Sequence, residues 1–303
     1  MAGQTLRRSD EVASSVAVLI VNYNAGDALA RCIESVLSQG QEVSVALVDN
    51  ASDDGSAQMV GSLFGRLENV SLVFNQDNRG FSRAVNQAAA LTRDGPEDYL
   101  LILNPDCELF PGSLRALVDA LETRPSAAMA GPMVVDRHGS ALRGTFRRFP
   151  DPWRAFLTFT GLARLEGKRA SLQGVEPDEP LPGEVTEVDA VSGACMLVRK
   201  TVYRELGGMD EGYTLHCEDL DLMYRLQQKG FARIFVPTAR VFHLQGLSSR
   251  RRPAWVHFQK HRGMQRFFKK FQAGDRSLPM RWLVISGIWI RFFVTLPWVL
   301  IRR

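Results

Sequence analysis

The sequence predicts an α/β fold built on a mostly parallel central sheet. Short apolar runs alternate with helical segments from Val16 to Leu103, and such alternation indicates parallel strands joined by right-handed crossovers. Each apolar run ends in Asn or Asp. Because parallel strands end at one edge of the sheet, these polar side chains should meet there, at the edge where α/β folds bind ligands.

The first half of the chain contains four strand–helix units. The expected elements are strands at 16–21, 43–48, 70–74 and from 99, with helices at 28–38, 56–64 and 81–91 between them. The strand from Tyr99 is apolar throughout, so we expect it to be buried on both faces. It must end at Pro105, because proline has no N–H to donate to a sheet ladder.

The second half is less regular. We expect helices at 111–121, 201–206 and 218–229 and strands at 127–135, 188–198 and 232–236. The segment 143–152 is rich in arginine and aromatic residues. The segment 166–187, with prolines and glycines among acids, is interpreted as a mobile surface loop.

Asn104 and Asp106 follow the central strand directly. Hard oxygen ligands at this edge suit Mg²⁺ or Mn²⁺ carrying a diphosphate. The structural alternative is an Asx-turn that ends the strand. His243 lies beside apolar residues and is either a packing residue or a partner of Asp106 at a metal or phosphate.

Glu218, Asp219 and Asp221 lie in the first turn of a helix. Acids also favour this position through the helix dipole, which is the structural alternative. On a helix Glu218 and Asp221 share a face, so Asp219 is free to face a pocket while the other two make structural contacts. A carboxylate held among acids can have a raised pKa, as a general base requires. Asp219 is the candidate base.

The charge of the 303-residue chain is +4, and from Arg250 onward Asp275 is the only acid. Its four scattered cysteines indicate free thiols in a reducing compartment. Residues 1–15 lack the apolar core of a signal peptide and are interpreted as a disordered leader. We therefore expect a leader at 1–15, a catalytic domain at 16–250 and a membrane-associating helical tail at 251–303.

The tail begins with aromatic and basic residues interleaved as in a helix that lies on an anionic membrane surface. Residues 282–301 are almost wholly apolar, and as a helix they would reach about 30 Å, enough to span a bilayer. Arg291 in the middle and Pro297 favour an interfacial or re-entrant segment over a span. A helix packed on the catalytic domain or a partner subunit is the other alternative. No nucleic-acid recognition motif accompanies the basic run.

Several motifs, in order, resemble the family 2 glycosyltransferases with the GT-A fold, and within them the bacterial rhamnosyltransferase-like branch. The matching segments are 21–24 (VNYN), 48–55 (VDNASDDG), 78–86 (NRGFSRAVN), 104–106 (NPD), 192–194 (SGA), 207–211 (GGMDE) and 218–222 (EDLDL). The resemblance runs from Val16 to Ser248.

The resemblance implies a role for each of these motifs. The residues implied for donor-nucleotide binding are Asn22, Asn24, Asp49, Asn50, Asp54, Asn78, Gly80, Phe81 and Asn104. Asp49 would bind the base, and Asn86 would brace the loop at the ribose–phosphate end. Asp106 matches the metal-binding acid of the Asp-x-Asp element, with His243 near the diphosphate, and Asp219 matches the catalytic base, supported by Glu218 and Asp221. Asn104 replaces the first acid, which lowers the charge available to Mg²⁺ or Mn²⁺.

The resemblance further implies inverting transfer of a sugar, with rhamnose from dTDP-rhamnose favoured. The implied partners are a nucleotide-diphosphate sugar donor, a polyprenyl-diphosphate-linked glycan acceptor and an anionic membrane surface, but no nucleic acid. The implied location is cytoplasmic, peripheral or monotopic on the inner face of the bacterial cell membrane. Neither the Gly-x-Gly-x-x-Gly of a Rossmann dehydrogenase nor the Lys-bearing phosphate loop of a nucleotidyltransferase follows the first strand. The remaining alternative is a non-catalytic membrane-bound nucleotide-sugar or glycan binder.

Overall fold

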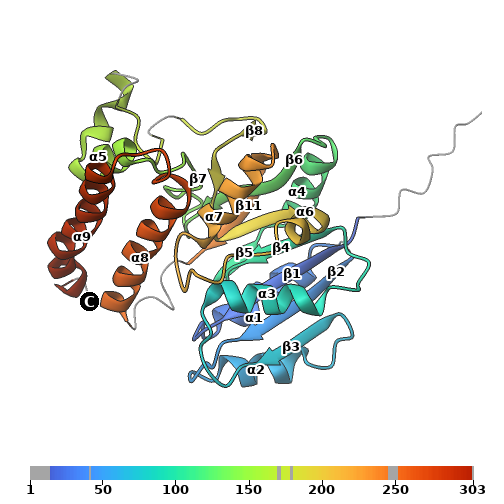
Figure 1. The fold of residues 1–303 in the computed structure, drawn as a ribbon. Coiled ribbons are helices and arrows are strands. Elements are labelled where there is room, and N and C mark those ends of the chain that lie inside the picture. The colour runs from blue at the N-terminus through green and yellow to red at the C-terminus, as the bar shows by residue number, and fades with distance from the viewer. Residues whose placement is uncertain (1–13, 41, 169–171, 178–179, 245–251, 302–303) are drawn as a thin grey trace, which may run out of the picture.

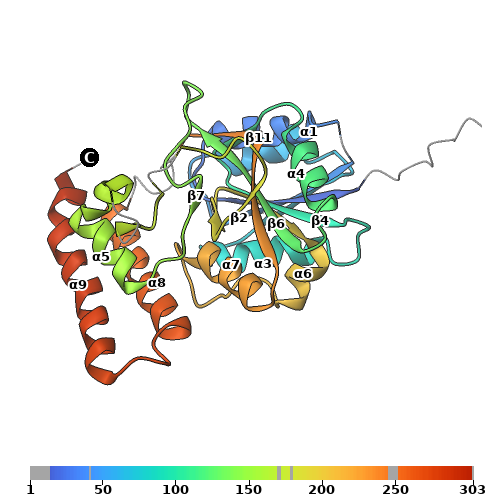
Figure 2. The ribbon, with the colours of Figure 1, turned by 90° about the horizontal axis from the view of Figure 1, so that it is seen from above.

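The computed structural model describes residues 14–40, 42–168, 172–177, 180–244 and 252–301. The predicted leader lies almost wholly outside this range, as do parts of the 166–187 loop and the predicted domain boundary at 250. The fold is a mixed, mostly parallel sheet between two layers of helices, with a separate group of helices at one side (Figures 1 and 2). The predicted fold class is confirmed.

The main sheet joins nine strands of the described chain in the order β3-β2-β1-β4-β10-β6-β11-β5, with β8 beside β11. Their bounds are β1 Val16–Asn22, β2 Val43–Asp49, β3 Val70–Phe74, β4 Tyr99–Leu103, β5 Cys107–Leu109, β6 Ala127–Val135, β8 Thr186–Glu187, β10 Cys195–Arg199 and β11 Ala232–His243. The first four strands are parallel to one another, whereas β10 is antiparallel to both β4 and β6. A small ladder pairs β7 (Phe146–Arg147) with β9 (Ala190–Val191).

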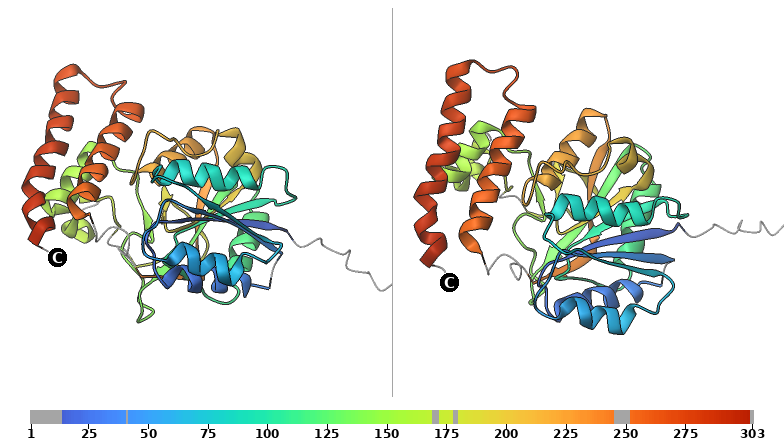
Figure 3. Two further views of the ribbon diagram at one scale, coloured as in Figure 1. Left: turned by 90° about the horizontal axis from the view of Figure 1, so that it is seen from below. Right: turned by 60° about the horizontal axis from the view of Figure 1, so that its bottom comes forward.

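The two faces of the sheet are covered by different helices, as Figure 3 shows. One core lies under α1 (Ala28–Leu37), α2 (Ser56–Phe64) and α4 (Ser113–Glu122). The other lies under α3 (Phe81–Leu91), α6 (Lys200–Glu205) and α7 (Glu218–Gln228). Every residue of β4 is buried, because helices cover both faces of this central strand.

Two strand predictions are wrong. The segment 188–198 is not one strand, because β9 and β10 are separated at residues 192–194, which form part of the site described below. The strand expected at 232–236 does not end at Pro237 but continues to His243. A register shift between Val236 and Arg240 accommodates the proline, since a bulge removes the ladder bond that proline cannot make.

The tail forms a helical hairpin of α8 (Pro253–Phe271) and α9 (Leu278–Ile301), with α5 (Pro152–Thr160) beside it (Figures 1 and 2). Among the described residues, α9 is the one helix long and apolar enough to cross a membrane, and its most apolar window has no buried residue. The Arg291 side chain, on α9, points towards α8, where its Nη1 lies 3.1 Å from His261 Nε2. The short 3₁₀ helix η1 (Leu162–Lys168) follows α5.

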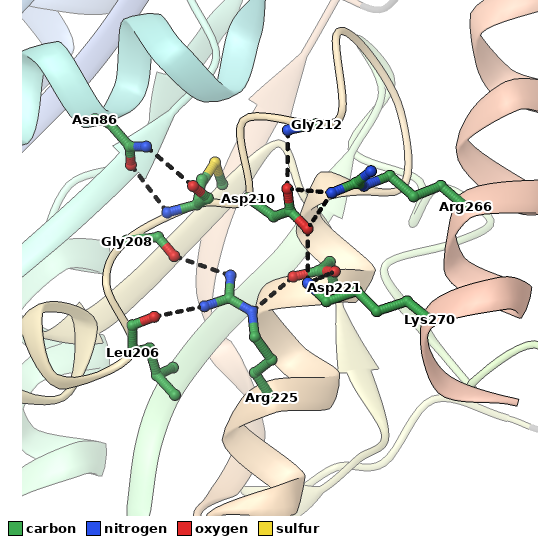
Figure 4. A network of polar contacts seen from close by, with 10 residues as sticks. Asn86, Leu206, Gly208, Asp210, Gly212, Asp221, Arg225, Arg266 and Lys270 are labelled. Atoms are coloured by element: carbon green, nitrogen blue, oxygen red, sulfur yellow. Dashed lines mark hydrogen bonds and ion pairs between the residues drawn. The ribbon is translucent and has the colours of Figure 1, made fainter. Parts of the chain in front are cut away.

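Helix α8 is bound to α7 and to the loop that precedes it by an ion-pair network, shown in Figure 4. Lys270 donates to Asp221 Oδ2 at 2.6 Å and to Asp210 Oδ2 at 2.7 Å, and Arg266 donates to Asp210 Oδ1 at 2.8 Å. Asp221, which is fully buried, also accepts from Arg225 Nε at 2.6 Å. The network therefore joins the tail to the first turn of α7, where Asp219 lies.

We expect Asp221→Ala to destabilise the protein by about 3 kcal/mol or more, because it leaves the Arg225 and Lys270 cations without their buried counter-ion. Urea denaturation would measure the loss. Asp119→Ala is a matched control, since Asp119 pairs with Arg115 in an exposed ion pair on α4 and its removal should cost about 0.5 kcal/mol or less. Equal losses in the two variants would contradict the role assigned to the network.

Candidate active site

The loops after β1 and β2 bring together the first group of predicted donor-binding residues. Asn22 Nδ2 donates to Asp49 Oδ1 at 2.7 Å, and the backbone N–H of Ser52 donates to Asp49 Oδ2 at 2.9 Å. Asn24 accepts from the Asp53 N–H at 2.8 Å, and Asp54 accepts from the Gly26 N–H at 2.8 Å. Asn22 and Asp49 are almost fully buried. These side chains therefore hold the two loops in one shape, with most of their polar atoms engaged within the protein.

The second group lies between β2 and α3. Asn50 donates to Asn78 Oδ1 at 3.1 Å, and Asn78 Oδ1 also accepts from the Gly80 N–H at 2.9 Å. Gly80 has φ +84°, and a Cβ there would lie 3.0 Å from the carbonyl oxygen of Thr214, so a larger residue is strained and crowded. The Phe81 N–H donates to the same oxygen at 3.0 Å. Asn78 is exposed and Phe81 half-buried.

The 207–217 loop, between α6 and α7, packs against this group through Thr214. Asn86 donates to the Met209 carbonyl at 2.9 Å and accepts from the Met209 N–H at 2.9 Å, so it fastens this loop rather than the loop containing Asn78. His216 and Cys217 both have left-handed backbones, with φ of 68° and 70°. Consecutive non-glycine residues in this region carry strain, and this strained turn leads directly into the first turn of α7.

The predicted metal-binding residues meet at the ends of β4 and β11. His243 Nε2 lies 3.2 Å from Asp106 Oδ1, and the Cys107 thiol is close enough to form a cluster with them. Burial raises the pKa of the Cys107 thiol well above its usual value, with Asp106 adding to the shift, so the thiol stays protonated. Asn104, two residues before Asp106, is half-buried. A carboxylate with an imidazole fits Mg²⁺ or Mn²⁺ better than a thiolate-preferring metal.

The candidate base, Asp219, is held by two contacts. Arg147 Nη2 donates to Asp219 Oδ2 at 2.5 Å. A Cβ at Gly193 would lie 2.6 Å from the same oxygen, so only glycine leaves room for the carboxylate there. The sequence placed Arg147 in an arginine-rich segment but gave no signal for its pairing with Asp219, because the two residues come from distant segments.

The raised carboxyl pKa in this acidic turn belongs to Glu218. Burial, then the neighbouring Asp219 charge, raises the pKa of Glu218 to about 8. Glu218 Oε2 is buried without a hydrogen-bond partner. The sequence predicted structural contacts for Glu218, but its Oε2 atom makes none. When Glu218 is protonated it carries no charge, so it needs no counter-ion in the protein interior.

This pKa gives a stability prediction for Glu218→Gln. Glutamate loses its proton near pH 4.5 in the unfolded chain but only near pH 8 in the folded protein. The native protein therefore loses stability as the pH rises through this window, by a total on the order of several kcal/mol. The uncharged glutamine should be as stable as glutamate at pH 4 and clearly more stable at pH 8.5. Melting curves at both values test this, and a stability difference independent of pH would contradict it.

Residues 193–194 lie between the segment that contains the predicted metal-binding Asp106 and the candidate base. The Ala194 carbonyl accepts from the Asn104 N–H at 2.9 Å, and Gly193 packs against the Asp219 carboxylate. The predicted metal-binding residues and the candidate base thus lie on either side of one short segment, beside polar loops at the carboxyl edge of the sheet. Together with the fold, this arrangement defines the class of enzymes that transfer sugars from nucleotide donors.

Comparison with known proteins identifies the family. The model of Glycosyl transferase family 2 matches residues 17–174. The N-acetylglucosaminyl-diphospho-decaprenol L-rhamnosyltransferase of Mycobacterium tuberculosis is 31% identical over 293 residues, covering 90% of each chain. Rhamnosyltransferase WbbL of Escherichia coli K12 is 24% identical, covering 75% of this chain and 83% of that protein. The chain belongs to glycosyl transferase family 2 and is a glycosyltransferase.

Solved structures show the GT-A fold. GalNAc-T7 with UDP, GalNAc and Mn²⁺ matches with a TM-score of 0.59 and 18% identity, covering 92% of this chain and 55% of that chain. The mannosyltransferase PcManGT of Pyrobaculum calidifontis, in complex with GDP-Man and Mn²⁺, matches with a TM-score of 0.57 and 16% identity, covering 94% of this chain and 71% of that chain. At these identities the likeness concerns the fold alone.

Proposed function

We propose that this enzyme transfers rhamnose, with inversion, from a nucleotide-diphosphate donor to a hydroxyl of a polyprenyl-diphosphate-linked glycan. Support comes from the relative in Mycobacterium tuberculosis, which is named for rhamnosyl transfer to a decaprenyl-diphosphate-linked N-acetylglucosamine and aligns over most of both chains. The rhamnosyltransferase of Escherichia coli supports the same sugar. dTDP-rhamnose is the proposed donor.

The observation that carries this proposal is the placement of Asp106 and Asp219 around residues 193–194. In this proposal Asp219 takes the proton from the acceptor hydroxyl through a carboxylate oxygen, while Arg147 holds the other oxygen in place. The deprotonated oxygen attacks the anomeric carbon from the face opposite the diphosphate, which inverts its configuration. The nucleoside diphosphate leaves towards Asp106 and His243.

Asp106 and His243 would hold Mg²⁺ or Mn²⁺, which when bound neutralises charge on the leaving diphosphate. Asn104, in place of a second acid, would contribute an amide oxygen rather than a charge. The loops containing Asn22, Asp49 and Asp54 would form the nucleotide end of the donor site, and Asn50, Asn78, Gly80 and Phe81 the ribose–phosphate end. Asn86, Glu218 and Asp221 would support the 207–217 loop and the start of α7.

We further propose that the enzyme works on the cytoplasmic face of the cell membrane, where α9 lies in the interface. Its exposed side chains include Trp282, Phe293 and Trp298, each more than 60% exposed. Such an apolar, tryptophan-rich surface is unfavourable in water but suits the headgroup–acyl boundary. The basic residues of α8 would contact anionic headgroups.

A donor screen tests the proposed function. Purified protein in detergent would be given dTDP-, UDP- and GDP-sugars with decaprenyl-diphosphate-linked N-acetylglucosamine, and the release of nucleoside diphosphate would be measured. We expect release from dTDP-rhamnose only when the acceptor and Mg²⁺ or Mn²⁺ are present. Acceptor-dependent release from a UDP- or GDP-sugar instead would overturn the choice of rhamnose.

A further inference from the structure

Three cationic side chains come from segments that are distant in the sequence: the charge of Lys260 interacts with those of Arg147 and Arg291, and Arg147 is paired with Asp219. Arg147 comes from β7, Lys260 from α8 and Arg291 from α9. Arg147 is paired with Asp219 through Nη2, while its Nε is buried without a partner. Neither Lys260 nor Arg291 forms an ion pair with a carboxylate in the part of the chain that the structure describes.

Helix α8 touches the turn that leads to Asp219. A Cβ at Gly263 would lie 2.6 Å from the His216 carbonyl oxygen and 3.3 Å from the Cys217 side chain, so the helix can approach this closely only at a glycine. Lys260 lies three residues earlier, on the same face of the helix. The contact at Gly263 therefore brings Lys260 close to the turn that precedes Asp219 and to Arg147, the partner of Asp219.

The charges in this region are unbalanced. The Lys260 side chain reaches solvent, yet surrounding protein and then the Arg291 and Arg147 charges lower its pKa. Glu218, which precedes Asp219 in the chain, holds its proton at neutral pH for the reason given above. Of the acids near Arg147 and Lys260, Asp219 pairs with Arg147 and Glu176 pairs with Arg143, so the cations outnumber the carboxylate charges. Such an excess favours binding of an anion with more than one negative charge.

An apolar surface adjoins the same cations. The Arg291 guanidinium lies 5.8 Å from the centre of the Phe159 ring on α5. Phe159 belongs to a row of exposed aromatic residues on this helix, with Trp153 and Phe156. Helix α9 also carries exposed apolar side chains, as described above. A ligand at this place meets cations at one end and aromatic or aliphatic side chains at the other.

We propose that Lys260 and Arg291, with Arg147, form the binding site for the diphosphate of the lipid-linked acceptor, and that the aromatic face of α5 contacts the first isoprenoid units. This site rests on the proposed function, which requires an acceptor hydroxyl close to Asp219. A sugar attached to a diphosphate held by these cations would be presented next to that carboxylate. An anionic phospholipid headgroup offers similar chemistry, and the experiment distinguishes the two sources.

The test is equilibrium binding of radiolabelled decaprenyl diphosphate, and separately of decaprenol, to the full chain in detergent micelles. We expect Lys260→Gln and Arg291→Gln each to weaken binding of the diphosphate by about tenfold or more, because each removes a charged contact. Binding of decaprenol should not change. Arg262→Gln and Lys269→Gln remove exposed charges of the same sign from α8 and should leave both affinities unchanged. Melting curves would verify that each variant is folded.

Equal losses in the Lys269→Gln control would overturn the proposal, because they would show only general attraction to the basic helix. The same holds if the wild-type protein binds the diphosphate no better than decaprenol. Vesicles containing phosphatidylglycerol give the second arm: if Lys260→Gln weakens vesicle binding and not diphosphate binding, the cations recognise the membrane instead. This binding assay needs neither a sugar donor nor sugar transfer. Its result can therefore be interpreted even if the donor screen fails.

Discussion

Asp219→Asn should lower kcat by about a hundredfold to ten-thousandfold, the range that a positioned general base contributes. Asparagine keeps the shape of the side chain and can still accept a hydrogen bond from Arg147, but it cannot take a proton from the acceptor. The KM for the donor should change little, because the residues proposed to bind the nucleotide lie on other loops. Steady-state transfer rates at varied donor concentrations measure both quantities.

Asp119→Asn is a suitable control for this prediction, because it makes the same chemical change in an exposed ion pair on α4. Its kcat should match that of the wild-type enzyme. If Asp219→Asn raised the donor KM and left kcat unchanged, Asp219 would be a donor-binding residue and not the base. The buried Glu218, with its pKa raised to about 8, would then be the next candidate to test.

Asp106→Ala should reduce the transfer rate by about a thousandfold, since a metal ion provides several kcal/mol of charge stabilisation in such reactions. His243→Gln should act in the same direction with a smaller effect, because Asp106 keeps the charged ligand. The decisive measurement is the concentration of Mn²⁺ that gives half-maximal rate, which should rise in both variants.

Cys107→Ala distinguishes a metal site formed by Asp106 and His243 from one in which the Cys107 thiolate is also a ligand. The Cys107 thiol is fully buried and its pKa is raised by burial, so it should not bind a hard metal. The half-maximal Mn²⁺ concentration should therefore stay at the wild-type value in Cys107→Ala. A shift as large as that in His243→Gln would show that the thiol is a ligand and would contradict the assignment.

The first half of the fold was predictable because its signals are local. Each of the strands β1 to β4 is an apolar run closed by a polar turn, and each intervening helix shows its own periodicity. The meeting of Asp106 with His243 also follows from strand ends that share one edge. Even a substitution such as Asn104 for the usual acid is visible in the sequence.

The rest depends on contacts between distant segments. Arg147 pairs with Asp219 across 72 residues, and no local pattern indicates which of several arginines does so. Strand β11 continues past Pro237 because a bulge accommodates the proline while the rest of the strand stays paired with β6. Which strand β11 pairs with depends on the whole fold and not on the local sequence. Similarly, Arg291 argued against a simple membrane span in the sequence, and its actual partners, His261 and Phe159, come from other helices.

The proposed reaction is metal-dependent transfer of rhamnose to a lipid-linked acceptor. Its most direct test incubates the protein with radiolabelled dTDP-rhamnose and decaprenyl-diphosphate-linked N-acetylglucosamine, then measures label in the lipid extract with Mn²⁺ or with EDTA. We predict labelled lipid with Mn²⁺, none with EDTA, and none with Asp219→Asn. Labelled lipid in EDTA would contradict the metal site, and label transfer by Asp219→Asn at the wild-type rate would contradict the catalytic assignment.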